Sequence, residues 1–160
     1  ANRIVNVVKR YLEKEIIKEV SEINNIVAKD KKILVVDDSN VIRNFIETIF
    51  DDNFEVLSAN DGKEAIDIVG LDTSNKIIGI LLDLNMPNID GFAVLEYFKV
   101  NNLFKKIPVF IITGENSEEM IAKARTYPIT DVLAKPFNEK DIKEAVEKTI
   151  EINSQNNLWV

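Results

Sequence analysis

The stretch Ile77-Ile78-Gly79-Ile80-Leu81-Leu82 is a short, almost wholly apolar run that stops abruptly at Asp83. Comparable runs occur at residues 33–36, 54–57, 107–112 and 132–133, and three of the five are nearly continuously apolar. Runs of this kind are typical of parallel strands that are covered by helices on both faces. This stretch and its counterparts therefore predict the sheet of an α/β protein.

Amphipathic segments separate these runs, which indicates crossover helices between parallel strands. Their apolar residues recur at three- and four-residue spacing, as in Ile42, Ile46 and Ile49. Five strands and five helices in strict alternation predict an open, doubly wound sheet with the flavodoxin-like strand order 2-1-3-4-5. Residues suited to N-caps stand where these helices should begin: Ser39, Asp61, Asp90, Asn116 or Ser117, and Asn138 with Asp141 three positions later.

The first 30 residues have a helical pattern and no strand. We expect residues 1–30 to form an amphipathic helix, residues 31–153 the α/β domain, and residues 154–160 a C-terminal tail. The apolar stripe of the helix must be covered, either by a second copy in a homodimer, which we favour, or by helices of the same chain. The stripe advances about 3.67 residues per step, close to the straight-helix period, through Val5, Val8, Leu12, Ile16, Val20, Ile23 and Val27.

Composition excludes several classes of function. The chain has no cysteine and no histidine, so it can form no disulfide, thiolate metal site or Ser-His or Cys-His catalytic pair. Any metal must be held by oxygen atoms, which favours a hard cation such as magnesium. The net charge of −7 repels nucleic-acid phosphates, and no apolar run approaches the length of a membrane span. We expect a cytoplasmic protein that binds neither nucleic acid nor membrane.

Polar side chains follow four of the five runs. Asp37 and Asp38 follow the first run, Asp83 the third, Thr113 the fourth, and Lys135 comes just after the fifth. Because ligands of open α/β sheets bind at the carboxyl ends of the strands, these side chains should converge on one edge. Three neighbouring carboxylates repel one another, and magnesium would relieve that repulsion while also bridging to phosphate oxygens. The sequence therefore predicts a site where Asp83 can attack phosphorus.

These residues lie in motifs that resemble those of response-regulator receiver domains, including the free-standing chemotaxis type, over about residues 32–152. The resemblance implies a two-component receiver that takes a phosphoryl group from a histidine kinase or phosphotransfer protein. It also implies self-dephosphorylation and altered binding of an unknown output protein. The matching motifs are Val35-Val36-Asp37-Asp38-Ser39, Asp83-Leu84-Asn85-Met86-Pro87-Asn88-Ile89-Asp90-Gly91, Ile111-Ile112-Thr113-Gly114 and Ala134-Lys135-Pro136-Phe137.

The resemblance also implies a role for each residue at the metal site. Asp83 is the phosphoacceptor and, together with Asp38, ligates magnesium directly. Asn85 lends its backbone carbonyl to the metal, and Asp37 acts through water. Thr113 and Lys135, by the same resemblance, contact the phosphoryl group.

Other positions would set the lifetime and the output of the phosphorylated state. In the family, residues matching Asn85 and Glu115 tune dephosphorylation. The family usually has Tyr or Phe three residues before the lysine, as a ring that swings inward when the threonine moves. This chain has Val132 there, so Thr113 lacks the aromatic partner of the usual switch.

Two other functions are compatible with parts of the pattern. A degenerate receiver acting as an interaction scaffold is suggested by Val132 and the extra helix, although the intact acidic residues argue against it. A haloacid-dehalogenase-type phosphatase also places an Asp after its first strand, but requires Asp-x-Asp where this chain has Asp37-Asp38-Ser39. We expect a signalling switch, which catalyses only its own phosphorylation and dephosphorylation, rather than an enzyme.

Overall fold

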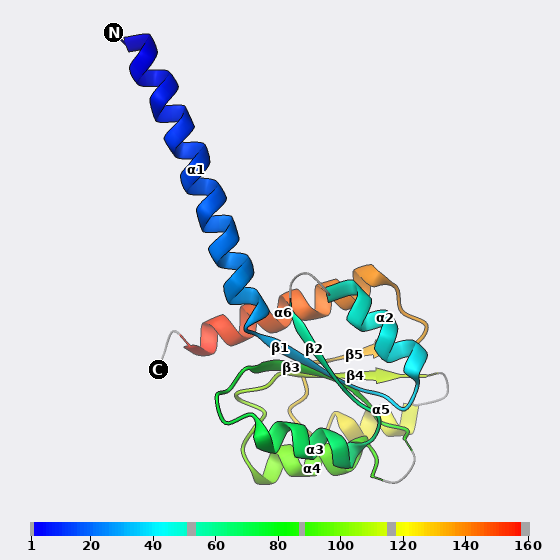
Figure 1. Ribbon diagram of the computed structural model, residues 1–160. Coiled ribbons are helices and arrows are strands. Elements are labelled where there is room, and N and C mark those ends of the chain that lie inside the picture. Colours follow the sequence, from blue (N-terminus) through cyan, green and yellow to red (C-terminus); the bar gives the residue numbers. More distant parts are fainter. Residues whose placement is uncertain (1, 51–53, 87–88, 115–117, 158–160) are drawn as a thin grey trace.

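The computed structural model describes residues 2–50, 54–86, 89–114 and 118–157, without the side chains of 24–29 and 153–157. Its five parallel strands form one sheet in the order β2-β1-β3-β4-β5, as predicted (Figure 1). Strand β3 is buried along its whole length, which explains its continuously apolar sequence. The strands are β1 (Lys32–Val36), β2 (Glu55–Ala59), β3 (Ile77–Asp83), β4 (Val109–Thr113) and β5 (Asp131–Ala134).

Helices cover both faces of the sheet and divide the core in two. Buried side chains of α2 and α6 pack on one face, and those of α3, α4 and α5 pack on the other. Figure 1 shows these two layers with the sheet between them. The helices are α1 (Asn2–Lys29), α2 (Asn40–Phe50), α3 (Gly62–Leu71), α4 (Gly91–Val100), α5 (Glu118–Ala124) and α6 (Glu139–Asn157).

The helix starts follow the predicted caps. Asp61 accepts a hydrogen bond from the Glu64 N–H at the start of α3, and Asp90 caps α4 in the same way. Asn138 and Asp141 bond each other's backbone N–H groups in a reciprocal pair at the start of α6. The cap expected at residues 116–117 lies outside the described residues.

Helix α6 and strand β4 differ in extent from the sequence prediction. Helix α6 continues to Asn157, so residues 154–157 of the predicted C-terminal tail are helical. No glycine or proline interrupts residues 139–157, and nothing local therefore stops the helix at 153. Strand β4 begins at Val109 rather than Ile107, because Pro108 has no N–H to donate to a sheet.

Helix α1 extends away from the sheet (Figure 1), and every side chain described from Asn2 to Ile23 is exposed. These side chains therefore do not lie on helices of the α/β domain. The predicted stripe member Val27 falls where side chains are not described. Among the described residues, no helix combines the length and hydropathy needed to cross a membrane.

Gly79 leaves space for α6 to lie against the centre of β3. A Cβ atom at this position would stand 2.3 Å from Cγ2 of Thr149. Thr149 is buried, and its hydroxyl donates to the Ala145 carbonyl at 2.9 Å, so its side chain is held in place. We expect Gly79→Ala to lower the free energy of unfolding by about 1–3 kcal/mol, measured by urea denaturation, because it overpacks this contact.

Two comparisons test the cause of this loss. Gly114→Ala should have little effect, because an added Cβ there meets no described atom within 4 Å. Adding Thr149→Ser to Gly79→Ala should restore part of the stability, since serine keeps the hydroxyl and removes the clashing methyl group. Equal stability of the Gly79→Ala and Gly114→Ala proteins would contradict the explanation.

Candidate functional site

Three acidic side chains meet at the carboxyl-terminal edge of the sheet. Asp37 and Asp38 directly follow β1, and Asp83 is the last residue of the adjacent strand β3. One carboxylate oxygen from each residue lies within 4.8 Å of the other two. Asp37 and Asp83 are buried, whereas Asp38 is exposed. The fold thus concentrates negative charge at one point and leaves it open to solvent on the side of Asp38.

Lys135 brings the compensating positive charge. Its Nζ lies 2.7 Å from Oδ2 of Asp37 and 3.7 Å from Oδ2 of Asp83. The backbone N–H of Lys135 donates to the carbonyl of Thr113 at 2.6 Å, which ties the end of β5 to the end of β4. The buried residue Thr113 therefore belongs to the same edge. With all groups ionised, three carboxylates face one ammonium, and negative charge remains in excess.

Backbone and side-chain donors hold Asp37 in position. Its Oδ1 accepts from the N–H of Ser39 at 2.9 Å, and its carbonyl accepts from the guanidinium of Arg43 at 2.6 Å. The sequence analysis missed Arg43. Its spacing could have indicated this contact, because Arg43 lies one helical turn after Ser39. Side chains of a helix lean toward its N-terminus, which here is the direction of Asp37.

The donor set fits a hard divalent cation. Oδ2 of Asp37 is buried, and its partner among the described residues is the Lys135 ammonium at 2.7 Å, which compensates its charge. This one ammonium faces three carboxylates, so negative charge remains for a further cation to balance. Asp37, Asp38 and Asp83 offer oxygen ligands only, which is the donor type that magnesium and calcium prefer.

The surroundings of Asp83 alter its acidity. Burial raises the pKa of Asp83 to about 6, and the charges of Asp37 and Asp38 act in the same direction. The backbone N–H of Asn85, which donates to Oδ1 of Asp83 at 3.1 Å, and the charge of Lys135 oppose this rise. Added positive charge at the site would favour the ionised, nucleophilic form of Asp83.

The loop after Asp83 returns close to this residue. Gly91, the first residue of α4, lies so near the Asp83 backbone that a Cβ atom would stand 2.4 Å from its carbonyl oxygen. Only glycine permits this approach, and the cap from Asp90 fixes the direction in which α4 leaves. The side chain of Asn85 is exposed on this loop.

The predicted switch position, Val132, is not among the residues of the acidic cluster. Val132 is half-buried on β5 and packs against the core beneath α3, α4 and α5. The hydroxyl of Tyr127 donates to Glu96 of α4 at 2.6 Å, a hydrogen bond that raises the pKa of Tyr127. This tyrosine is thus tied to α4 rather than standing in for the missing aromatic residue. Glu115 lies outside the described residues.

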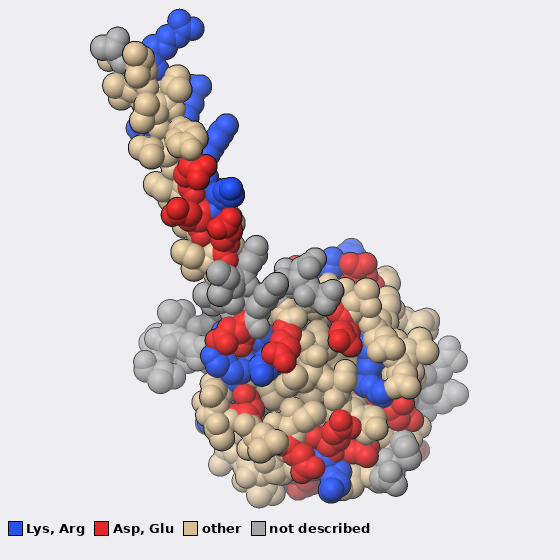
Figure 2. Space-filling view, viewed as in Figure 1, with Lys and Arg blue, Asp and Glu red and all other residues tan. Residues whose placement is uncertain are grey.

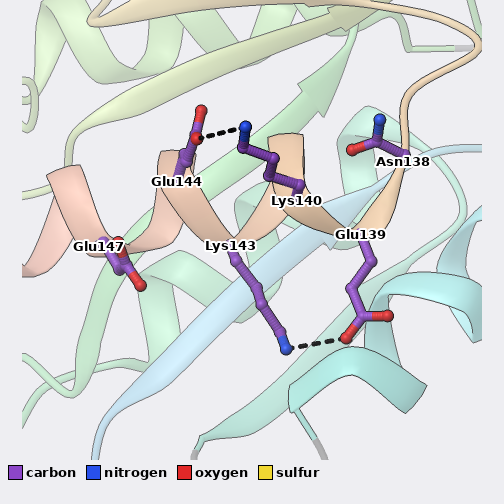
Figure 3. Close-up of a pocket in the computed structure, with 6 residues that line it drawn as sticks. All are labelled: Asn138, Glu139, Lys140, Lys143, Glu144 and Glu147. Carbon is purple, nitrogen blue, oxygen red and sulfur yellow. Dashed lines mark ion pairs between the residues drawn. The ribbon is translucent and has the colours of Figure 1, made fainter.

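A hollow on the surface of α6 is separate from this cluster (Figure 3). Glu139 pairs with Lys143 at 2.8 Å, and Lys140 pairs with Glu144 at 3.9 Å, each one turn apart. All four of these side chains are exposed, and their charges already compensate one another along the helix. The hollow therefore has the character of an ordinary solvated helix face. Its lining consists of Asn138, Glu139, Lys140, Lys143, Glu144 and Glu147.

Comparisons with known proteins agree with one another. A family model for the response regulator receiver domain matches residues 33–147. The chain is 32% identical over 126 residues to sporulation initiation phosphotransferase F of Bacillus subtilis, which covers 78% of this chain and 98% of that protein. It is also 32% identical over 124 residues to chemotaxis protein CheY1 of Helicobacter pylori, covering 76% of this chain and 98% of that protein.

The structural comparison gives the same result. The chemotaxis response regulator CheY4 of Vibrio cholerae matches with a TM-score of 0.66 and 29% identity, over 74% of this chain and 98% of that chain. These matches identify a receiver domain rather than a haloacid-dehalogenase-type phosphatase. The chain therefore belongs to the response regulator receiver domains, the phospho-accepting signalling switches of two-component systems.

Proposed function

We propose that the phosphoryl group is accepted by Asp83, with Lys135 and Thr113 as the groups that contact it. The observation that carries this proposal is the position of Asp83. Its carboxylate is buried at the end of β3, within 4.8 Å of two other acids and 3.7 Å from the Lys135 ammonium. Its raised pKa also makes the charge of Asp83 dependent on a neighbouring cation.

Magnesium is the proposed cation. Asp38 and Asp83 would bind it directly, the Asn85 carbonyl would add a further oxygen, and Asp37 would act through water. When bound, magnesium supplies positive charge against the oxygens of the transferring phosphoryl group. The excess of three carboxylates over the one ammonium of Lys135 and the exposure of Asp38 support a cation site that is held by buried residues on one side and reached from solvent on the other.

The side chains then have distinct tasks in the transfer. The carboxylate of Asp83 attacks phosphorus, the bond from phosphorus to the donor nitrogen breaks, and an aspartyl phosphate forms. Lys135 balances charge on the phosphoryl oxygens, and the Thr113 hydroxyl donates a hydrogen bond to one of them. Attack by water later releases phosphate and restores Asp83, at a rate that Asn85 and Glu115 would tune.

The proposed phosphoryl donor is a histidine kinase or a phosphotransfer protein. The proposed output partner is a protein that binds the phosphorylated and unphosphorylated receiver with different affinity. The names of relatives include a phosphotransferase and a sensor kinase/phosphatase, which supports this choice of donor class. In the chain itself, Val132 would follow the movement of Thr113 by adjusting core packing. It cannot carry a hydroxyl from the surface to the interior, as a tyrosine could.

The direct test is the intact mass of the protein after incubation with acetyl phosphate and magnesium. We expect one phosphoryl group to be added to the chain. The Asp83→Asn variant has nearly the same shape but no nucleophilic carboxylate, and we expect it to gain none. Asp67→Asn is the matched control, since Asp67 is an exposed residue of α3 away from the cluster.

Each outcome of this test is informative. Labelling of the Asp83→Asn protein would assign the phosphoryl group to another residue. Failure of the wild-type protein to gain mass, with a known receiver labelled in parallel, would favour the degenerate scaffold that the sequence left open.

Magnesium should also stabilise the folded protein, because only the folded chain assembles the carboxylates. At ~10–100-fold excess over the dissociation constant the gain is about 1–3 kcal/mol, measured as a shift in thermal unfolding. Asp38→Ala should lose most of this shift, whereas Asp67→Ala should keep it. An undiminished shift in the Asp38→Ala protein would exclude direct ligation by Asp38.

The raised pKa of Asp83 predicts a pH dependence of stability in the absence of metal. The ordinary pKa of an aspartate is 3.8 and that of Asp83 in the folded chain is about 6, so between these values the folded state holds a proton that the unfolded state has released. Stability from this group therefore falls as the pH rises from about 4 to about 6. In the presence of a chelator, the free energy of unfolding of the Asp83→Asn protein minus that of the wild type should increase by about 1–3 kcal/mol as the pH rises from about 4 to about 6.

Urea denaturation at several pH values measures this difference. Saturating magnesium should reduce the pH-dependent part, because a bound cation favours the ionised carboxylate in the wild-type protein. A difference between the two proteins that stays constant from pH 4 to pH 7 would show that Asp83 titrates normally.

A further inference from the structure

Helix α1 carries an apolar stripe that none of the described residues covers. The six stripe residues with described side chains are each between 49% and 62% exposed. Helical stability in proteins comes mostly from packing of an apolar face, which residues 2–23 do not obtain from the described part of their own chain. The six residues are Val5, Val8, Leu12, Ile16, Val20 and Ile23.

Charge is distributed unevenly along the same helix. Residues 2–12 contain three basic residues and no acidic one, whereas residues 13–23 contain four glutamates and two lysines. Figure 2 shows the acidic side chains gathered in the half of the helix nearer the sheet. The helix therefore has a positive free half and a negative half next to the domain. The basic residues of the first half are Arg3, Lys9 and Arg10, and the glutamates of the second are Glu13, Glu15, Glu19 and Glu22.

This asymmetry makes the helix complementary to a reversed copy of itself. Two copies aligned in parallel would set positive half against positive half and negative against negative. Two antiparallel copies set each positive half against a negative one. Like charges brought together weaken association and opposite charges favour it, so charge selects the antiparallel arrangement.

The positions of the apolar residues agree with this arrangement. Reversing the helix about Lys14 exchanges Val5 with Ile23, Val8 with Val20, and Leu12 with Ile16, so that every stripe residue meets another stripe residue. We propose that α1 pairs with α1 of a second copy in an antiparallel, two-stranded contact centred on Lys14. This inference does not rest on the assignment of the phosphorylation site.

The antiparallel contact determines where the two receivers lie. The 28 residues of α1 span about 40 Å at ~1.5 Å per residue. Because each domain follows the C-terminal end of its own helix, the two domains stand at opposite ends of the helix pair. Both acidic sites remain accessible to a phosphoryl donor, and neither receiver contacts the other.

Cysteine cross-linking tests the orientation without interference, because the chain has no cysteine of its own. The variants are full-length Val5→Cys and Ile23→Cys, oxidised mildly alone and as an equimolar mixture. In the antiparallel pair, position 5 of one chain faces position 23 of the other, and the two copies of position 5 lie about 27 Å apart. We expect disulfide-linked dimers in the mixture that join one variant to the other, and almost none from either variant alone.

The alternative results overturn the proposal. A parallel pair would link Val5→Cys to itself and Ile23→Cys to itself. Absence of any cross-link, together with a monomer in sedimentation at concentrations well above micromolar, would show that another partner or no partner covers the stripe.

Substitutions on the two faces of α1 test the contact independently. Leu12→Asn with Ile16→Asn should raise the dimer dissociation constant about 100-fold or more, because both changes fall at the centre of the stripe. Val7→Asn is the matched control. Val7 is also exposed but lies nine residues, or two and a half turns, from Ile16, on the opposite face, and should change the constant less than about threefold.

If Val7→Asn weakened the dimer as much as Leu12→Asn with Ile16→Asn, the apolar stripe would not be the interface. Phosphorylation of the Leu12→Asn, Ile16→Asn protein by acetyl phosphate should proceed as in the wild type. This readout separates failure of the helix pairing from failure of the proposed receiver chemistry.

Reversal of charge in one half tests the orientation again. Lys9→Glu with Arg10→Glu makes the free half acidic and should weaken an antiparallel dimer about tenfold. A parallel dimer would not be weakened, because the like charge on its facing free halves becomes smaller. Adding Glu19→Lys and Glu22→Lys should restore affinity to within about threefold of wild type. Failure of the second pair to restore affinity would contradict pairing of opposite halves.

Discussion

Repulsion among three carboxylates held within 4.8 Å of one another is the constraint on which the rest of the site depends. The order of the strands creates it, because β1 and β3 are neighbours and both lead into acidic residues. Burial in the two apolar layers keeps Asp37 and Asp83 from moving apart. Lys135 offsets part of the charge, and the carboxylates remain in excess.

The fold could be read from the sequence because its signals are local. Each strand is marked by an apolar run, and the caps at Asp61, Asp90 and Asn138 depend on residues two to three positions away. The extent of α6 was predicted too short although its signal is also local, since residues 139–157 contain no glycine or proline that would stop the helix at 153.

The convergence of the acidic residues was also predictable, because strand ends in a parallel sheet share one edge. The detailed pairings were not. No pattern indicates that Lys135 lies nearer Asp37 than Asp83, or that Tyr127 bonds Glu96, which is 31 residues away in the chain. Such contacts depend on side-chain directions that are set only once the helices are packed. The contact of Arg43 was predictable only in part. The sequence shows its spacing from Ser39 but does not indicate that its guanidinium donates to the backbone carbonyl of Asp37.

The place where α1 joins the domain has a mechanical consequence. Only Asp30 and Lys31 separate α1 from β1, and β1 is hydrogen-bonded along its length to β2 on one side and β3 on the other. A force applied through α1 enters at Lys32 and loads both ladders together in shear, so that many hydrogen bonds resist it at once. The acids Asp37 and Asp38 stand at the far end of this strand. The hydrogen bonds of the sheet therefore resist a force on α1 before that force can displace Asp37 and Asp38.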